Sequence, residues 1–238
     1  TDIPLREGDE SFLGGDRPGR NSDQSFWGTG LSSLLSGARL DPGTDEGGPI
    51  GGGWWWHTPE DTRDKVDVDV LVEETRIAAT LVSRLCHSPT LPHDFVATVA
   101  ELRAGVEAVE SDTDRSFDAL RADVDALVDA VEAAQTRLER ADAPDTPLAR
   151  RAEDLQVTLA NELVPALYVA GDDYGQDPAL PHRQLPALRE AAAAAASAPT
   201  RRERRFAQTT LRRAENRLRH RVGRATDAVE GFVDRSGE

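Results

Sequence analysis

The sequence predicts a mainly α-helical protein whose C-terminal three-quarters form an antiparallel helical array. Two observations carry this prediction. Apolar residues in 117–138 are spaced 3, 4, 3, 4, 3 and 4 apart, which is the heptad spacing of helices that pack at a shallow angle. The composition also changes near Val66: Gly, Ser, Asp and Trp dominate before it, and apolar residues at helical spacing follow it.

The N-terminal region, residues 1–66, contains only short apolar runs, of which Trp54–Trp56 is one. We expect loops with a strand or two and one short helix there. The first long helix is predicted over residues 67–87, where apolar residues share one face: Val70, Leu71, Ile77, Leu81 and Leu85. Pro89 then ends it.

Further helices are predicted by the apolar stripes at 95–109 and 117–138, and by four leucines at i+4 spacing over 155–167. The poly-Ala segment 191–196 is predicted to be helical and to contribute little to packing. The last predicted helix runs from about 201 to 233, with its apolar stripe at 211–232. The stripes at 95–109, 117–138 and 211–232 offer more apolar face than a short bundle buries easily, so we expect a homodimer.

The charge balance is strongly acidic, with a formal net charge of −15, and Lys65 is the only lysine among 28 basic residues. This is typical of a protein adapted to high salt, although a genome rich in G and C would also favour arginine and alanine. The acid excess argues against nucleic acid as a partner. One segment runs against it: residues 201–224 hold ten arginines and two glutamates. A nucleic-acid patch would need such a run, but pairing with the acidic helices of 107–142 is the favoured interpretation.

No apolar run approaches the roughly 20 residues that cross a membrane, and no signal-peptide pattern opens the chain, so we expect a cytoplasmic protein. The sequence contains no methionine, so Thr1 is expected to follow a trimmed segment or to lie inside a longer protein. The single cysteine, Cys86, is expected to be a small core residue. Catalytic patterns are sparse, because no H-E-x-x-H or G-x-S-x-G motif occurs. We expect four histidines to be solvated surface groups: His87, His93, His182 and His220.

The segment "GGGWWWHTPEDTRDKVD" (51–67) contains three of the four tryptophans directly before His57. It resembles the last metal-ligand segment of the co-catalytic dinuclear zinc peptidases, the aminopeptidase Y and glutamate carboxypeptidase family. In that family an aromatic-rich strand ends in a histidine, small residues and Asp-Thr follow, and a further aspartate opens the final helix of the domain. The matching positions here are Trp55, Trp56, His57, Thr58, Asp61, Thr62 and Asp67.

Two weaker matches extend the resemblance. The stretch "NSDQSFWGTGLSS" (21–33) resembles the Ser-Asp-His-x-x-Phe loop near the substrate pocket of that family, with Gln24 in place of the usual histidine. The resemblance implies that Asp23, Phe26 and Trp27 border a substrate-binding pocket. Residues 161–188 resemble the helical region that follows the peptidase domain in transferrin-receptor relatives.

The resemblance implies a fold and an activity. Residues 1–88 would be the remnant of an α/β zinc-peptidase domain, its last strand and helix, and residues 89–238 a helical, dimerisation-like domain. The parent would be a zinc exopeptidase that hydrolyses peptide substrates with a hydroxide bridging two zinc ions. His57 would be a ligand of the second zinc, and Asp61 would orient it from outside the coordination sphere or cap the following helix.

The family's other ligands are a His-x-Asp pair, a Glu-Glu pair that supplies the general base, and one more aspartate. None of these patterns occurs in the 56 residues before His57, so no catalytic residue is expected in this chain, and the chain alone is expected to be inactive. Two alternatives stay open. The chain could be a non-catalytic helical interaction module, as in receptor relatives without metals, or His57 could be an ordinary buried histidine beside an aromatic strand.

Overall fold

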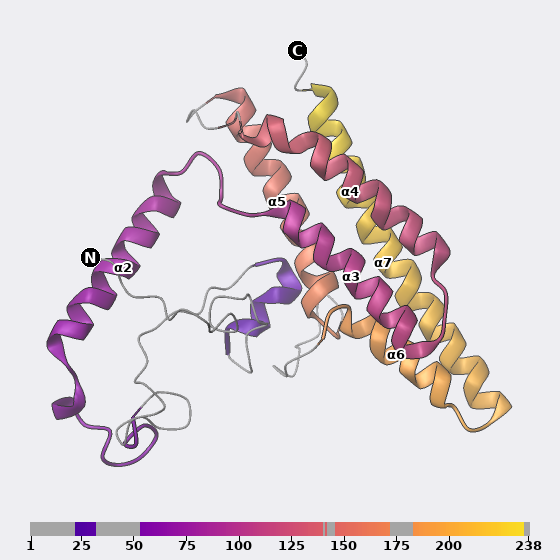
Figure 1. Ribbon diagram of the computed structural model, residues 1–238, viewed down its shortest axis with the longest axis horizontal. Coiled ribbons are helices and arrows are strands. Elements are labelled where there is room, and N and C mark those ends of the chain that lie inside the picture. The colour runs from indigo at the N-terminus through magenta and orange to yellow at the C-terminus, as the bar shows by residue number, and fades with distance from the viewer. Residues whose placement is uncertain (1–21, 32–52, 140, 142–145, 172–182, 236–238) are drawn as a thin grey trace. The chain divides into compact units, whose positions relative to one another are not determined.

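The computed structural model describes residues 22–31, 53–139, 141, 146–171 and 183–235 (Figure 1). The chain divides into two compact units, one of residues 1–33 with 89–238 and one of residues 34–88. All regular secondary structure in the described residues is helical, which confirms the predicted mainly α class. No strand occurs among them, so the expected α/β remnant is not present in this part of the chain.

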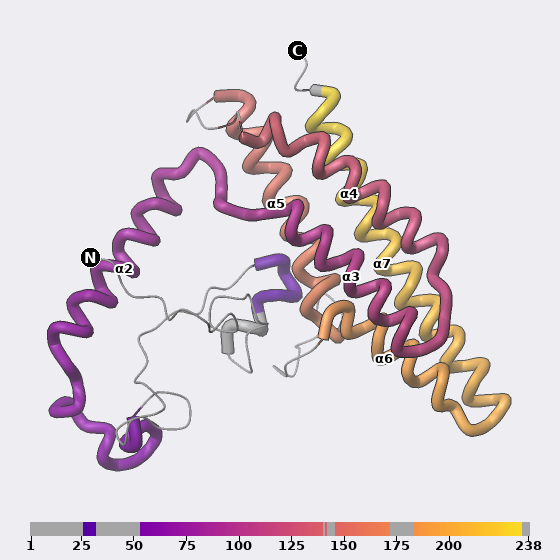
Figure 2. Tube along the Cα trace, viewed as in Figure 1, coloured from indigo at the N-terminus to yellow at the C-terminus, as the bar shows by residue number. Residues whose placement is uncertain are grey.

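The larger unit is a bundle of five helices, in which α4 runs back along α3 and α7 runs back along α5 and α6, which follow one another in the same direction (Figure 2). They are α3 (Phe95–Thr113), α4 (Asp118–Glu139), α5 (Pro147–Tyr168), α6 (Pro186–Ser197) and α7 (Arg201–Arg235). The longest, α7, packs against α4, α5 and α6, and α3 packs against α4. The predicted antiparallel array is therefore confirmed.

The predicted apolar stripes form the core of this bundle. From α3 the buried residues include Phe95, Val99, Leu102, Val106 and Val109, and from α4 Leu120, Val124, Leu127, Val131 and Ala134. The leucines of α5 and the stripe of α7 complete the same cluster. The stripes therefore bury one another within one chain. The homodimer was expected because these stripes looked too large for one bundle to bury, and the bundle buries most of their apolar surface.

The poly-Ala helix α6 contributes more to packing than expected. Ala191, Ala192 and Ala195 are buried against the bundle core, and α6 packs closely along α7. Small side chains let two helix backbones approach closely, so an alanine face packs well where a neighbouring helix follows it at short distance. The expectation that this segment contributes little was wrong for that reason.

Side chains at the helix starts satisfy the backbone N–H groups that have no partner within the helix. The Asp94 carboxylate accepts from the Ala97 amide at 2.9 Å, and the Thr146 hydroxyl accepts from Ala149 at 3.0 Å. At α7, Thr200 and Glu203 each accept a hydrogen bond from the other's backbone amide, which is a reciprocal capping box. These caps explain why the helices begin where they do.

A short 3-10 helix, η1 (Ser22–Thr29), docks on α5 within this unit. Trp27 is buried, and its ring lies 5.1 Å from that of Tyr168. Gly30 follows at a φ of +80°, and a Cβ built there would lie 2.4 Å from the Asn161 Cα atom. Only glycine permits this close approach of two backbones.

The smaller unit contains a turn around the three tryptophans, a short 3-10 helix η2 (Arg63–Lys65) and α2 (Val68–His87). The prediction of a helix over 67–87 is confirmed, with Asp67 as its N-cap. No described residue of α2 is buried. Cys86 is exposed, which corrects its assignment to the core.

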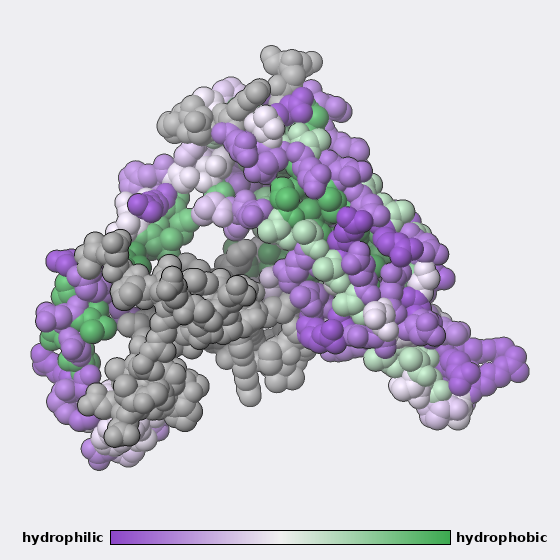
Figure 3. Space-filling view, in the orientation of Figure 1, coloured by the Kyte–Doolittle hydropathy of each residue, from purple (hydrophilic) through white to green (hydrophobic). Residues whose placement is uncertain are grey.

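The apolar face of α2 is exposed along its length, and Figure 3 shows hydrophobic side chains on this helix. Its exposed large apolar residues are Val68, Val70, Leu71, Val72, Ile77 and Val82. A surface helix of a folded domain normally turns such a face toward a core. In the described part of this unit nothing buries it.

Candidate functional site

The tryptophan segment forms consecutive tight turns, which corrects the expected aromatic strand. The Trp56 amide donates to the Gly53 carbonyl at 3.3 Å, and the Thr58 amide donates to the Trp55 carbonyl at 3.0 Å. Gly53 and His57 both have positive φ, +79° and +61°. Hydrogen bonds across three residues satisfy the backbone locally, and the described residues offer no neighbouring strand with which residues 53–57 could pair.

His57 is exposed, so it is not a buried histidine beside a strand. Its imidazole stacks on Trp56, with ring centroids 3.6 Å apart and planes at 21°. The imidazole makes no hydrogen bond or ion pair with any residue that the structure describes. Stacking therefore orients the ring while both of its nitrogens stay unbonded within this part of the chain.

The tryptophans pack on their neighbours. Trp54 and Trp55 meet edge to face at 5.8 Å. A Cβ on Gly53 would lie 2.5 Å from the Trp55 ring, so the glycine is required where that ring crosses the backbone. Trp54 and Trp56 remain 56% and 43% exposed. These rings hold the turn and leave a large aromatic surface beside His57.

Asp61 does not cap α2. It is exposed, and its backbone amide donates to the Thr58 carbonyl at 3.1 Å. The cap is Asp67, whose carboxylate accepts from the amides of Asp69 at 2.9 Å and Val70 at 3.2 Å. Asp64 lies between Asp61 and Asp67 in the chain, and hydrogen bonds from Lys65 and Thr62 lower the pKa of Asp64 to about 2. Asp64 therefore stays a carboxylate in this turn down to acidic pH.

The described residues do not make a zinc site. No group of three or more His, Cys, Asp or Glu side chains in this part of the chain could hold a metal ion. Zinc sites in proteins use three or four protein ligands, and His57 stands alone as a candidate here. Any metal bound through His57 needs ligands from elsewhere.

The three residues expected at a substrate pocket lie in η1. Trp27 is buried against Tyr168, and Phe26 is 58% exposed. The backbone of Asp23 belongs to η1. None of the three lines a cavity among those described, but the next two residues, Gly28 and Thr29, do.

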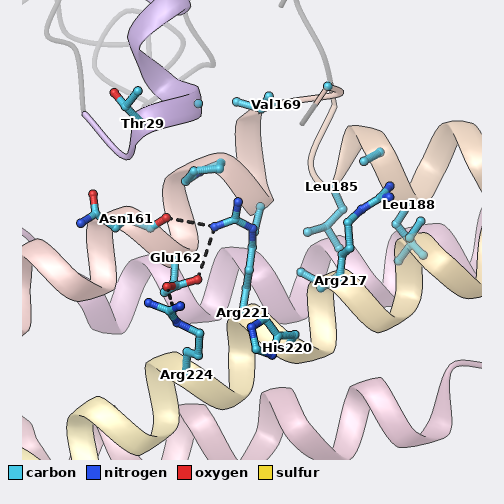
Figure 4. Close-up of a pocket in the computed structure, with 17 residues that line it drawn as sticks. Thr29, Asn161, Glu162, Val169, Leu185, Leu188, Arg217, His220, Arg221 and Arg224 are labelled. Atoms are coloured by element: carbon cyan, nitrogen blue, oxygen red, sulfur yellow. Dashed lines mark hydrogen bonds and ion pairs between the residues drawn. The ribbon is translucent and has the colours of Figure 1, made fainter. Parts of the chain in front are cut away.

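That cavity lies within the larger unit, has a volume of about 630 Å³, is open to solvent on one side, and is lined by residues of η1, α5, α6 and α7 (Figure 4). Apolar atoms come from Pro165, Leu185, Leu188, Ala214 and Leu218. The charged residues come from α7 at positions i, i+4 and i+7, namely Arg217, Arg221 and Arg224, and from α5 as Glu162. The spacing places the three arginines on one side of α7.

Glu162 and a proline fix two of these arginines. The Glu162 side chain is 7% exposed and pairs with Arg221 at 3.3 Å and with Arg224 at 2.8 Å. Pro165 has no N–H to donate to the carbonyl four residues earlier, that of Asn161. The Arg221 guanidinium donates to this carbonyl at 3.1 Å instead. Figure 4 shows the Arg221 guanidinium between the Asn161 carbonyl and the Glu162 carboxylate.

Arg217 differs from its neighbours, because it is exposed and makes no ion pair or hydrogen bond with any described residue. The expected pairing of the basic α7 face with acidic helices holds at Arg219, which donates to Asp123 on α4 at 2.6 Å. This hydrogen bond raises the pKa of Arg219. We did not predict the cavity from the sequence. The signals that could have indicated it are Pro165 inside a helix and the arginines at i, i+4 and i+7.

Comparison with protein-family models, curated proteins and solved structures finds no match to this chain. No helix in the described ranges is long and apolar enough to cross a membrane.

Proposed function

We propose that this chain is the C-terminal part of a zinc-dependent exopeptidase, to which it contributes one metal ligand, His57. The remaining ligands and the general base come from residues outside the part of the chain that the structure describes. The activity is the hydrolysis of peptide bonds at a chain end. The chain alone is inactive.

The observation that carries the proposal is the presentation of His57. Its ring is oriented by stacking on Trp56, is exposed, and has no hydrogen-bond partner among the described residues. A histidine that holds a fold together is normally buried with its ring nitrogens hydrogen-bonded to protein, and His57 is neither buried nor bonded in this way among the described residues. A metal ligand needs a neutral imidazole with a free nitrogen and a fixed ring plane. The sequence motif around His57 supports the same role.

The test uses the reading frame extended upstream of Thr1, with hydrolysis of aminoacyl and acidic dipeptides and bound zinc as its two measurements. The extended protein is expected to hydrolyse one of these substrates. His57→Ala should lower the rate by more than about a hundredfold and release one of the two zinc ions, because a lost ligand opens the site. His87→Ala is the matched control, since His87 is exposed in the same unit, and it should leave both measurements unchanged.

Two outcomes would contradict the proposal. One is an upstream frame that lacks a His-x-Asp pair, a Glu-Glu pair and a further aspartate. The other is an active extended protein that keeps its rate and both zinc ions in the His57→Ala variant. Hydrolysis by the 238-residue chain alone, above a metal-stripped control, would overturn the incomplete-site part of the proposal.

The second candidate is a non-catalytic helical interaction module that pairs with a second copy of the chain. The exposed apolar face of α2 favours it, since Leu71, Ile77 and Val82 are 50%, 45% and 58% exposed. A 20-residue helix without tertiary packing is marginally stable in water. Burying this face against a copy of itself would supply the missing packing.

Sedimentation of the chain at tens of micromolar separates the candidates. The interaction module requires a dimer that Ile77→Glu dissociates and that Thr80→Glu does not, because Thr80 lies on the polar face of α2. A monomeric chain contradicts the second candidate. A dimer that disappears in the extended protein supports the first, since the rest of a catalytic domain would then cover α2.

A further inference from the structure

We propose that the cavity between η1, α5, α6 and α7 binds a small carboxylate with an apolar body, and that Arg217 is the residue that contacts its charge. This site does not involve His57 and does not depend on the exopeptidase proposal.

The cavity has the size of a ligand pocket. At about 630 Å³ it falls within the 300–1,000 Å³ typical of ligand pockets. Its walls come from four different helical elements, which hold it open inside one unit (Figure 4). A pocket built between packed helices is a common place for a ligand in a helical bundle.

Part of the cavity wall is apolar. Leu185 and Leu188 from one side and Ala214 and Leu218 from α7 contribute buried carbon surface. These residues also belong to the core of the bundle, so their positions are fixed by packing. These four side chains are at most 6% exposed, so an apolar ligand body of a few carbon atoms would gain by leaving water and packing on a fixed wall without rearranging the helices.

The charged groups that line the cavity are mainly positive. The lining residues include three guanidinium groups and one carboxylate, that of Glu162. Glu162 is already paired with Arg221 and Arg224, whereas Arg217 has no partner among the described residues. A guanidinium matches the planar, two-oxygen geometry of a carboxylate better than a single-point donor does. The excess charge therefore favours a ligand that carries one carboxylate.

Structural roles account for Arg219 and for the two other arginines that line the cavity, Arg221 and Arg224, but not for Arg217. Arg219 ties α7 to α4 through Asp123, and Arg221 satisfies the Asn161 carbonyl that Pro165 leaves free. Arg217 does neither, although it lies one turn before Arg221 on the same side. The structure needs no guanidinium at this position.

The test is titration calorimetry of the 238-residue chain with three organic probes, and with inorganic phosphate as a fourth, at one salt concentration. N-acetyl-L-phenylalanine and octanoate both carry a carboxylate and an apolar body, and they distinguish a peptide-like ligand from a fatty-acid-like one. N-acetyl-L-phenylalaninamide has the same body without the charge. At least one of the two carboxylates is expected to bind at millimolar concentration or below, and the amide at least about tenfold more weakly.

Two variants and a matched control locate the binding. Arg217→Gln should weaken the carboxylate by about tenfold or more, whereas Arg213→Gln, an exposed arginine of α7 outside the cavity, should not change it. Ala187→Phe fills the cavity from α6 and should abolish binding while far-UV circular dichroism stays the same. The proposal is overturned if neither carboxylate binds, if acid and amide bind alike, or if Arg217→Gln and Arg213→Gln behave alike. Equally tight binding of inorganic phosphate would also overturn it, because the apolar wall would then play no part.

Discussion

Two glycines of the larger unit illustrate how much a single residue depends on its surroundings. Gly30 has a φ of +80° and lies against the Asn161 backbone, so a Cβ there meets atoms that cannot move aside. Gly223 lies inside α7, where a Cβ would meet nothing within 4 Å. The same change from glycine to alanine should therefore have opposite effects at these two positions.

We predict that Gly30→Ala destabilises the docking of η1 on α5. The left-handed backbone alone costs about 1–2 kcal/mol with a side chain present, and the clash adds to it. Trp27 should become exposed, which a red shift of tryptophan fluorescence would report. Gly223→Ala should raise the free energy of unfolding by about 1 kcal/mol, because alanine favours the helix. Destabilisation by both changes, measured by urea denaturation, would show that the space around Gly223 is smaller than described.

His93 provides a prediction of pH dependence. It is half-buried beside Phe95, with ring centroids 5.5 Å apart, and burial lowers the pKa of His93 below its ordinary value of 6.5. As the pH falls through 6.5, the unfolded chain gains a proton at His93 that the folded chain resists. The free energy of unfolding should therefore decrease as the pH is lowered through this range.

The measurement is thermal unfolding of the wild type and of His93→Gln between pH 7.5 and 5.5. Glutamine cannot titrate, so the variant should lose less stability over this range than the wild type. His220→Gln controls for the loss of an exposed histidine. Identical pH profiles for the wild type and His93→Gln would contradict this prediction.

At the scale of an element, α6 shows that helix packing depends on side-chain size as much as on hydrophobicity. Its buried alanines lie on the side that packs along α7, and Ala193 and Ala194 are exposed. Ala192 is 0% exposed. The close approach of α6 to α7 depends on the absence of larger side chains at the buried positions.

We predict that Ala192→Leu destabilises the bundle by about 1–3 kcal/mol through overpacking. Ala194→Leu introduces the same side chain on the exposed side and should change stability by less than about 0.5 kcal/mol. Urea denaturation of both variants measures the difference. Equal effects of the two variants would mean that α6 does not pack as closely as the structure shows.

At the scale of the whole molecule, the balance of charge decides how the protein responds to salt. The chain has 43 acidic and 28 basic residues. Some acids are paired, as Glu110 and Asp118 are with Arg121, but such surface ion pairs contribute only about 0–1 kcal/mol each. The repulsion between the excess carboxylates acts over the entire surface and opposes the compact state.

Molar KCl should therefore stabilise the protein. At about 1 M salt the Debye length shrinks to about 3 Å, which removes the long-range repulsion and weakens only the few exposed ion pairs. The helical circular dichroism signal and the midpoint of thermal unfolding should both rise between dilute buffer and molar KCl. A protein indifferent to salt would refute the adaptation to high salt that its composition suggests.

The sequence by itself determined the long helices and, in the larger unit, the buried faces of α3, α4, α5 and α7. Apolar residues at 3.6-residue spacing bury the same face in any bundle, so the stripe from Phe95 to Val109 was predictable before any partner was known. The N-cap Asp67 and Pro89 likewise act within a few residues of themselves and mark the two ends of α2.

The tertiary structure alone decided which residues come together from distant parts of the chain. A strand requires a neighbour, so the tryptophan segment could resemble a strand and still form turns in the described residues. The cavity depends on Pro165 of α5 meeting Arg221 of α7, and no local spacing encodes that meeting. A side chain's type is local information, but its partner is set by how the helices pack: Arg219 and Arg221 find partners on α4 and α5, and Arg217 finds none among the described residues.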